Sequence, residues 1–146
     1  MVSEPFVKRY APTKLSEVLG QGKAIKQFAE FINSFPKSKA VLFAGAPGVG
    51  KTSVVKAFAN EFNFEVVELN ASDKRNKKSI IEVILPACQQ ASIFGNKKII
   101  VLDEIDGLSG MKDRGGASEL VKVIDATKFP LILIANDAYS KKLKSI

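Results

Sequence analysis

The residues with the clearest chemistry lie in a glycine-rich segment, Gly45-x-x-x-x-Gly50-Lys51-Thr52, which joins a short apolar run to a helical pattern. A strand, a glycine-rich turn and a helix in this order form a loop that cradles phosphate groups. The backbone N–H groups of the turn point at the phosphates, Lys51 reaches the β- and γ-phosphates, and the Thr52 hydroxyl can bind Mg²⁺. The segment therefore predicts a nucleoside triphosphate site. The alternative is a chance glycine turn with a surface lysine.

Two acidic residues, Asp103 and Glu104, follow a second apolar run. In open α/β sheets, ligands bind at the carboxyl ends of the strands. There, Asp103 could hold the Mg²⁺ that Thr52 also contacts, and Glu104 could polarise a water for attack on the γ-phosphate. The alternative is a pair of solvated acids at a strand end.

A third apolar run, Leu131-Ile-Leu-Ile-Ala135, ends at Asn136. A polar amide at this position suits a contact with the γ-phosphate or with the attacking water. The alternative is an asparagine that caps the next helix.

Composition limits the remaining functions. The chain has 146 residues, of which 46% are hydrophobic, enough for one domain with a core, and no apolar run approaches the length of a membrane span. The segment Met1-Val-Ser-Glu-Pro5 lacks the pattern of a secretion signal, so we expect a soluble, cytoplasmic protein. With Cys88 as the one cysteine and no histidine, a disulfide within the chain, a zinc site and Ser-His or Cys-His catalysis are excluded.

The charge is strongly positive, since 22 Lys and Arg residues face 15 Asp and Glu residues, a formal net charge of +7. A nucleotide alone does not require this excess, which suits a polyanionic partner such as DNA. A basic surface that serves only solubility is the alternative.

The spacing of apolar residues predicts the elements that carry these groups. We expect an extended arm over 1–21, helices over 22–35, 51–62, 75–91 and 117–126, strands over 40–44, 64–69, 98–102 and 131–135, and a loop over 107–116. Phe62 is expected among the buried residues of its helix, Val121 is one of the apolar residues of the last predicted helix, and Pro86 is expected to kink the third helix. Apolar strands that alternate with helices predict an α/β fold, with a parallel sheet covered on both faces.

Together, the three segments resemble those of AAA+ ATPases, P-loop NTPases in which Asn136 would occupy the sensor-1 position. The finer resemblance is to clamp loaders of the replication factor C type. The arm Arg9-Tyr10-Ala-Pro12…Leu15-Ser-Glu-Val18-Leu19-Gly20-Gln21 is similar to their adenine-binding segment, and Asn70-Ala-Ser72-Asp73 to their Asn-Ala-Ser-Asp box. The run Asp103-Glu-Ile-Asp106 with Asp113-Arg114-Gly115-Gly116 resembles the N-terminal ATPase portion of archaeal-type large subunits.

This resemblance implies a set of site residues. The catalytic residues would be Lys51, Glu104 and Asn136, and the Mg²⁺ ligands Thr52 and Asp103. The adenine of ATP would contact residues of the arm, namely Val7, Tyr10, Val18 and Leu19. The phosphates would be held by Gly45, Pro47, Gly48, Val49, Gly50, Lys51, Thr52 and Ser53.

The resemblance also implies a task, the ATP-driven loading of a sliding clamp onto primed DNA together with small loader subunits. A neighbouring subunit would supply the arginine that speeds hydrolysis, so the isolated chain would turn ATP over slowly. Basic residues near two predicted helix starts are candidate DNA contacts, although each could equally lie on a solvated helix face: Lys74, Arg75, Lys77, Lys78 and Arg114. Another AAA+ remodeller, such as a helicase or helicase loader, and a scaffold subunit that binds nucleotide without hydrolysing it are the alternatives. An archaeal protein of this kind would be nucleoid-associated.

Two domains follow from the resemblance, the arm over 1–21 and an incomplete AAA+ domain over 22–146. The family's sheet has the order 5-1-4-3-2 and is followed by a helical lid, and we expect the fifth strand and the lid to be absent here. Strand 40–44 would then lie at an open, apolar edge. The isolated chain is expected to be marginally stable, to aggregate through this edge, or to need a second chain carrying the missing parts.

Overall fold

A computed structural model of the chain describes residues 10–71, 80–92, 95, 97–107 and 114–137. Most of the predicted DNA contacts and one predicted adenine contact lie outside the described residues, namely Lys74, Arg75, Lys77, Lys78 and Val7. Arg114 is the first residue of a helix, but its side chain is not described.

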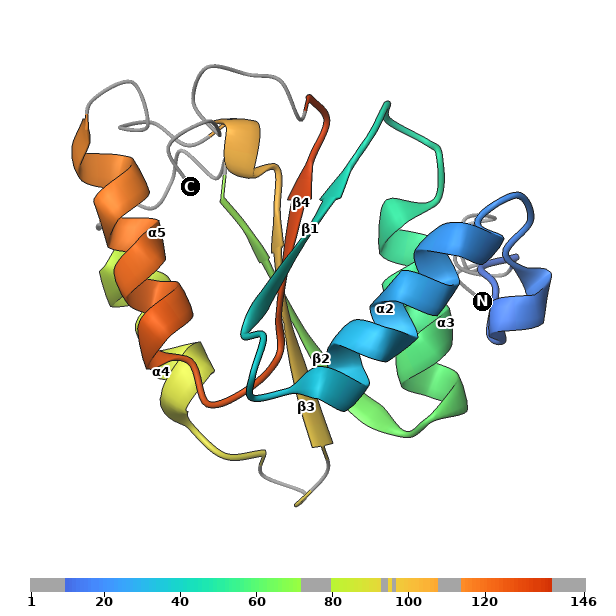
Figure 1. The fold of residues 1–146 in the computed structure, drawn as a ribbon, viewed down its shortest axis with the longest axis horizontal. Coiled ribbons are helices and arrows are strands. Elements are labelled where there is room, and N and C mark those ends of the chain that lie inside the picture. Colours follow the sequence, from blue (N-terminus) through green and yellow to red (C-terminus); the bar gives the residue numbers. More distant parts are fainter. Residues whose placement is uncertain (1–9, 72–79, 93–94, 96, 108–113, 138–146) are drawn as a thin grey trace, which may run out of the picture.

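Four parallel strands form one sheet (Figure 1): β1 (Ala40–Ala44), β2 (Phe64–Asn70), β3 (Lys97–Asp103) and β4 (Leu131–Ala135). Their order is β1-β4-β3-β2, as predicted from the family resemblance. Leu131 of β4 lies opposite both Ala40 of β1 and Ile100 of β3. Since all four strands run in one direction, their carboxyl ends meet at one edge of the sheet, as a site built from three strand ends requires.

Helices cover both faces of the sheet, as expected for a parallel sheet (Figure 1). One face is covered by α2 (Gly22–Ser34) and α3 (Lys51–Glu61), the other by α4 (Ile80–Gln89) and α5 (Arg114–Ala126). Two short 3₁₀ helices complete the described elements, η1 (Leu15–Glu17) in the arm and η2 (Ile105–Gly107) after β3. The fold class predicted from the sequence is confirmed.

The strand residues divide between two cores by simple alternation. Ile99 and Val101 of β3 pack with Phe28 of α2 and Val55 of α3 in one cluster. Ile100, which lies between them, faces the other way and packs in a second cluster with side chains of α4 and α5. Burial on both faces explains why β3 and β4 are apolar almost throughout.

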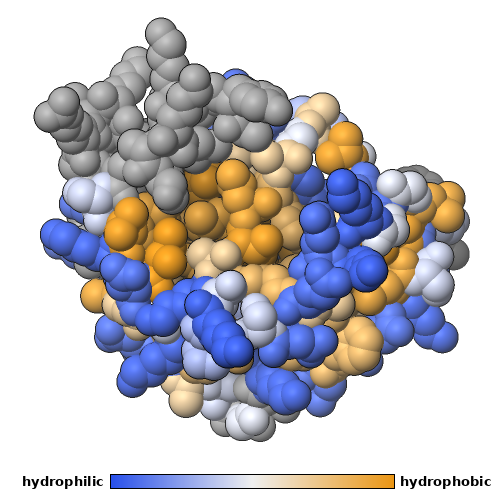
Figure 2. Space-filling view, viewed as in Figure 1, coloured by the Kyte–Doolittle hydropathy of each residue, from blue (hydrophilic) through white to orange (hydrophobic). Residues whose placement is uncertain are grey.

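The edge strand β1 is less buried than its neighbours. In the described part of the sheet it pairs only with β4, and Leu42 is 44% exposed. A groove of about 410 Å³ runs beside it, and Leu42 of β1 and Ile124 of α5 both line this groove. Figure 2 shows apolar side chains gathered near the middle of this face. Among the described strands, β1 therefore stands at the end of the order β1-β4-β3-β2 and carries apolar side chains.

Three local predictions were wrong. The arm is not wholly extended, since Leu15–Glu17 forms a 3₁₀ turn. Helix α5 begins at Arg114 rather than Ala117, because two glycines are tolerated in a first turn when the remaining helix packs well. Phe62, which was predicted to be buried, is 52% exposed, since it lies at the margin of an apolar face that periodicity alone assigns too widely. Pro86 lies inside α4, and the predicted start of that helix lies outside the described residues.

The single cysteine is a core residue. Cys88 is fully buried on α4, and this burial raises the pKa of its thiol. A buried thiol with a raised pKa is a poor nucleophile, so Cys88 has a packing role. Within the described ranges, no helix is long and apolar enough to cross a membrane.

Candidate nucleotide-binding site

The phosphate loop joins the end of β1 to the start of α3, and its shape depends on two glycines. Gly48 has φ +80° and Gly50 has φ +95°, a left-handed backbone that residues with a Cβ rarely adopt. Gly50 is also the N-cap residue of α3. The loop therefore turns tightly into a helix N-terminus, where unpaired N–H groups and the helix dipole favour an anion.

Lys51, at the start of α3, links the loop to the far side of the site. Its Nζ donates hydrogen bonds to the carbonyl oxygens of Gly45, at 2.6 Å, and Ala46, at 3.0 Å. A third hydrogen bond reaches Oδ1 of Asn136 at 3.3 Å, across 85 residues of sequence. The ammonium thus lies between the loop and the end of β4, where a phosphate held by the loop would be within its reach.

One pocket of about 410 Å³ collects the predicted segments. Its walls come from the phosphate loop, the start of α3 and the ends of β3 and β4. The residues that line it are Pro47, Gly48, Gly50, Lys51, Thr52, Ser53, Asp103, Glu104, Ile134 and Asn136. The structure therefore brings together the loop, the acid pair and the amide that the sequence had suggested separately.

The acid pair occupies a sharp turn at the end of β3. Glu104 has φ +55°, which costs a residue with a side chain about 1–2 kcal/mol. Its N–H donates to Oδ1 of Asp103 at 2.7 Å, which offsets part of this cost. Strained backbone that a fold maintains is found mainly at functional sites. Both Asp103 and Glu104 line the pocket at this turn.

Asp106 is a further residue of the site that our sequence reasoning did not assign. Its Oδ2 accepts a hydrogen bond from the backbone N–H of Asn136 at 3.2 Å. The end of β4 is therefore held by the same acidic segment that supplies Asp103 and Glu104. The available signal was the second aspartate of Asp103-Glu-Ile-Asp106, but which group it contacts depends on the order of the strands.

The donor set suits Mg²⁺. Thr52 and Asp103 line the same pocket and offer hydroxyl and carboxylate oxygens, which this hard cation prefers. Within the described ranges, no group of three or more His, Cys, Asp or Glu side chains is placed to hold a metal. A Mg²⁺ ion at this site would therefore depend on phosphate oxygens and waters for most of its ligands, as it commonly does.

The arm, which carries the predicted adenine contacts, lies against the last turn of α3. The Nδ2 of Asn60 donates to the Thr13 carbonyl at 2.9 Å, and the Leu15 N–H donates to Oε2 of Glu61 at 2.9 Å. Within the arm, the Glu17 carboxylate accepts hydrogen bonds from the N–H groups of Thr13 and Lys14, which lower its pKa. These contacts give the arm a defined path towards the loop.

The predicted adenine contacts differ in exposure. Tyr10 is 72% exposed and Leu19 is 87% exposed, so both offer apolar surface to a ligand. Val18 instead packs against the core cluster that contains Phe28. The arm therefore combines a buried anchor with two exposed side chains.

Gln21, at the end of the arm, was also not assigned to the site from the sequence. Its Nε2 donates to the carbonyl oxygen of Val49, inside the phosphate loop, at 2.8 Å. This hydrogen bond connects the arm directly to the loop. Gln21 is therefore a candidate positioning residue.

Gln21→Ala is expected to weaken ATP binding roughly threefold to tenfold, because one hydrogen bond contributes about 0.5–1.5 kcal/mol. Titration with ATP, alongside thermal unfolding of each variant, measures the effect. Lys23→Ala, which changes an exposed residue of the adjacent helix, serves as the control. Equal affinity of the Gln21 variant and the wild type would exclude this positioning role.

The comparisons with known proteins agree with this geometry. The family model of the ATPase family associated with various cellular activities (AAA) matches residues 41–145. The chain is 47% identical to the replication factor C large subunit of Methanococcus vannielii, over 98% of this chain and 30% of that protein. The large subunits of Staphylothermus marinus and Thermofilum pendens are each 40% identical over 97% of this chain, which covers 34% and 36% of their lengths. The chain thus spans about a third of the curated relatives that it matches.

Proposed function

The chain belongs to the AAA family of ATPases, and we propose that its loop pocket binds ATP with Mg²⁺ and hydrolyses it as part of a clamp loader. One observation carries this proposal: Lys51, Asp103, Glu104 and Asn136 come from three distant segments and line the same pocket. Each has the chemistry that phosphoryl transfer requires, a cation, a metal ligand, a base and a polar amide.

Each residue of the pocket would have a separate role in phosphate binding, hydrolysis or Mg²⁺ binding. The turn from Gly48 to Gly50 would hold the phosphates by its N–H groups, and Lys51 would neutralise the charge that develops on the γ-phosphate. Glu104 would accept a proton from the attacking water, and Asn136 would orient that water or a γ-phosphate oxygen. When bound, Mg²⁺ supplies charge neutralisation to the phosphates, and Thr52 and Asp103 would hold it.

The clamp-loader role rests on the similarity to large subunits of replication factor C. We propose that the chain acts with small loader subunits and couples ATP binding to the loading of a sliding clamp onto primed DNA. The basic excess of the chain supports contact with DNA, and the assignment of Lys74, Arg75, Lys77, Lys78 and Arg114 to that contact stays a prediction. On this proposal, the arm over 1–21 would contact the adenine and residues 22–146 would form the remaining nucleotide site.

The purified chain is expected to bind ATP with Mg²⁺ but to hydrolyse it slowly. An arginine supplied by a neighbouring subunit raises such rates by about 10³–10⁵. Calorimetric titration measures binding, and phosphate release with and without the small subunits of a related clamp loader measures turnover. Fast turnover by the chain alone would contradict the dependence on a partner, and failure to bind ATP would contradict the site itself.

A further inference from the structure

A second cavity lies at the amino ends of the strands, whereas the nucleotide pocket lies at their carboxyl ends. It has a volume of about 610 Å³ and is built where β2 and β3 begin, beside the last turns of α2 and α3 and the segment that precedes β4. Because all four strands are parallel, their first residues lie a full strand length away from Asp103 and Asn136. This cavity is therefore separate from the nucleotide site.

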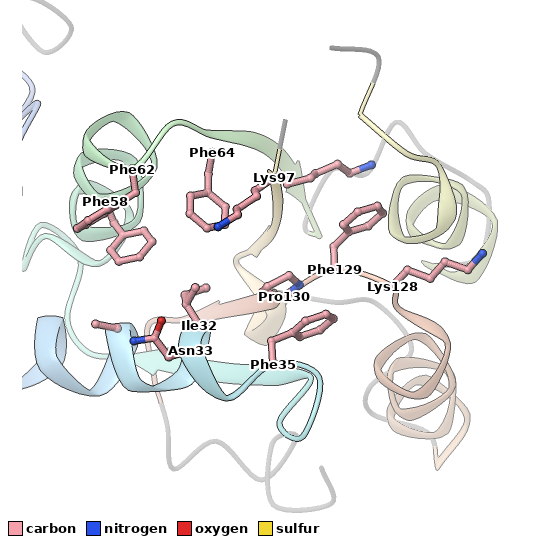
Figure 3. A pocket seen from close by; sticks show the side chains of 12 residues that line it. Ile32, Asn33, Phe35, Phe58, Phe62, Phe64, Lys97, Lys128, Phe129 and Pro130 are labelled. Atoms are coloured by element: carbon pink, nitrogen blue, oxygen red, sulfur yellow. The ribbon is translucent and has the colours of Figure 1, made fainter. Parts of the chain in front are cut away.

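Aromatic side chains line the cavity from two directions (Figure 3). Phe58, Phe62 and Phe64 lie on one side, and Phe35 and Phe129 lie on the other. The rings of Phe58 and Phe62 have centroids 4.7 Å apart, and those of Phe58 and Phe64 are 5.6 Å apart. Phe62 is nevertheless 52% exposed, which is unusual for an aromatic residue that closes an apolar cluster. The space between the two groups of rings thus offers an apolar slot that is open to solvent.

Three lysines are among the residues that line the cavity. Nζ of Lys97 lies 5.7 Å from the ring centroid of Phe64, and Nζ of Lys98 lies 4.7 Å from that of Phe129. Lys98 is only 5% exposed and donates to the Gln90 carbonyl at 2.7 Å, so one positive charge is built into the wall. Lys97 and Lys128 are exposed lining residues of the cavity, and the Lys128 side chain points away from the rings into solvent in Figure 3. Among the described residues that line the cavity, none carries a carboxylate.

We call this cavity the Phe–Lys pocket, after the phenylalanine and lysine residues that line it. We propose that it docks a short acidic peptide segment of a partner protein. A large apolar side chain of the peptide enters between the two groups of phenyl rings. Its flanking carboxylates pair with Lys97 and Lys128 at the rim. An apolar centre surrounded by charged residues is the usual anatomy of a protein interface, and aromatic anchors in such pockets carry most of the binding energy.

Two other kinds of ligand fit the pocket less well. Small-molecule sites bury most of their ligand, whereas Phe62 lies half exposed and leaves this slot open. Single-stranded nucleic acid needs free ring faces along a continuous basic track. Here Phe58 and Phe64 pack against each other, and Lys98 is bound to a backbone carbonyl, so the charges do not form such a track.

The proposal is tested by selection from a phage-displayed library of random short peptides. The wild-type chain is the bait, and a Phe62→Ala, Lys128→Glu double variant is the counter-selection. We expect enrichment of peptides with Phe, Leu or Trp next to Asp or Glu. A synthesised peptide from this set should bind each single variant at least roughly tenfold more weakly, because truncation of an anchor or reversal of a charge removes a central contact.

Matched variants on α5 complete the design. Val121→Ala and Lys122→Glu change an exposed apolar residue and an exposed lysine outside the pocket, and both should bind the peptide like the wild type. ATP affinity should be unchanged in every variant, which shows that each one folds. The proposal is overturned if no acidic peptides are enriched, if Phe62→Ala binds them as tightly as the wild type, or if oligothymidylate binds at these residues and the peptides do not.

Discussion

Lys51→Ala is expected to weaken ATP binding by roughly 10²–10⁴-fold. Its ammonium lies within 3.3 Å of the loop carbonyls and of Asn136, between the two walls of the pocket. On the proposed function, that ammonium contacts two phosphate groups, and each charged hydrogen bond contributes about 1.5–3 kcal/mol. Since about 1.4 kcal/mol is tenfold in affinity, losing both gives this range.

Lys56→Ala is a matched control for this variant, because Lys56 lies on the same helix, outside the pocket. Its Nζ pairs with Glu68 at 2.8 Å, and its side chain is 53% exposed. An exposed ion pair of this kind contributes about 0–1 kcal/mol, so this variant should fold and bind ATP normally. Calorimetric titration measures the ATP affinity of both variants, and thermal unfolding checks that both are folded. Retention of ATP affinity in Lys51→Ala would place the nucleotide site elsewhere.

Glu104→Gln is expected to preserve ATP binding and to lower turnover by about 10²–10⁴-fold, the usual contribution of a general base. Glutamine has the same shape and the same backbone requirements as glutamate, so the turn at φ +55° and its hydrogen bond to Asp103 should remain. What the variant lacks is a carboxylate that can take a proton from water.

The measurement is single-turnover hydrolysis in an assembly with small clamp-loader subunits, alongside ATP titration of the chain alone. Glu30→Gln, at an exposed position on α2, controls for the loss of a negative charge. Hydrolysis at the wild-type rate would assign the base to another residue. Loss of binding would instead show that Glu104 acts in holding the nucleotide.

The sequence by itself determined the local parts of this protein. The four strands were predicted to within one residue at each end, because continuous apolar runs between turn residues are a local signal. The phosphate loop was also predictable, since Gly45 to Thr52 is a single segment in which strand, turn and helix follow one another. Resemblance to a known family added the strand order, which no local pattern contains.

The tertiary structure decided which distant groups meet. The hydrogen bonds from Lys51 to Asn136, from Asn136 to Asp106 and from Gln21 to Val49 each join separate segments. Such contacts depend on the side-by-side placement of strand ends and on side-chain rotamers, which sequence spacing does not specify. Sequence analysis could therefore name the candidates for catalysis but not the hydrogen bonds that hold them.

The Phe–Lys pocket, at the amino ends of the strands, was likewise decided by the tertiary structure and not by the sequence pattern. Helical periodicity assigned Phe62 to the core, because it measures which residues share a helix face and not what lies opposite. Only the arrangement of α2, α3 and the strand starts leaves this ring half exposed in a cavity that Lys97 and Phe129 also line. A site made of ordinary core and surface residues has no sequence pattern of its own, because the packing of several elements creates it.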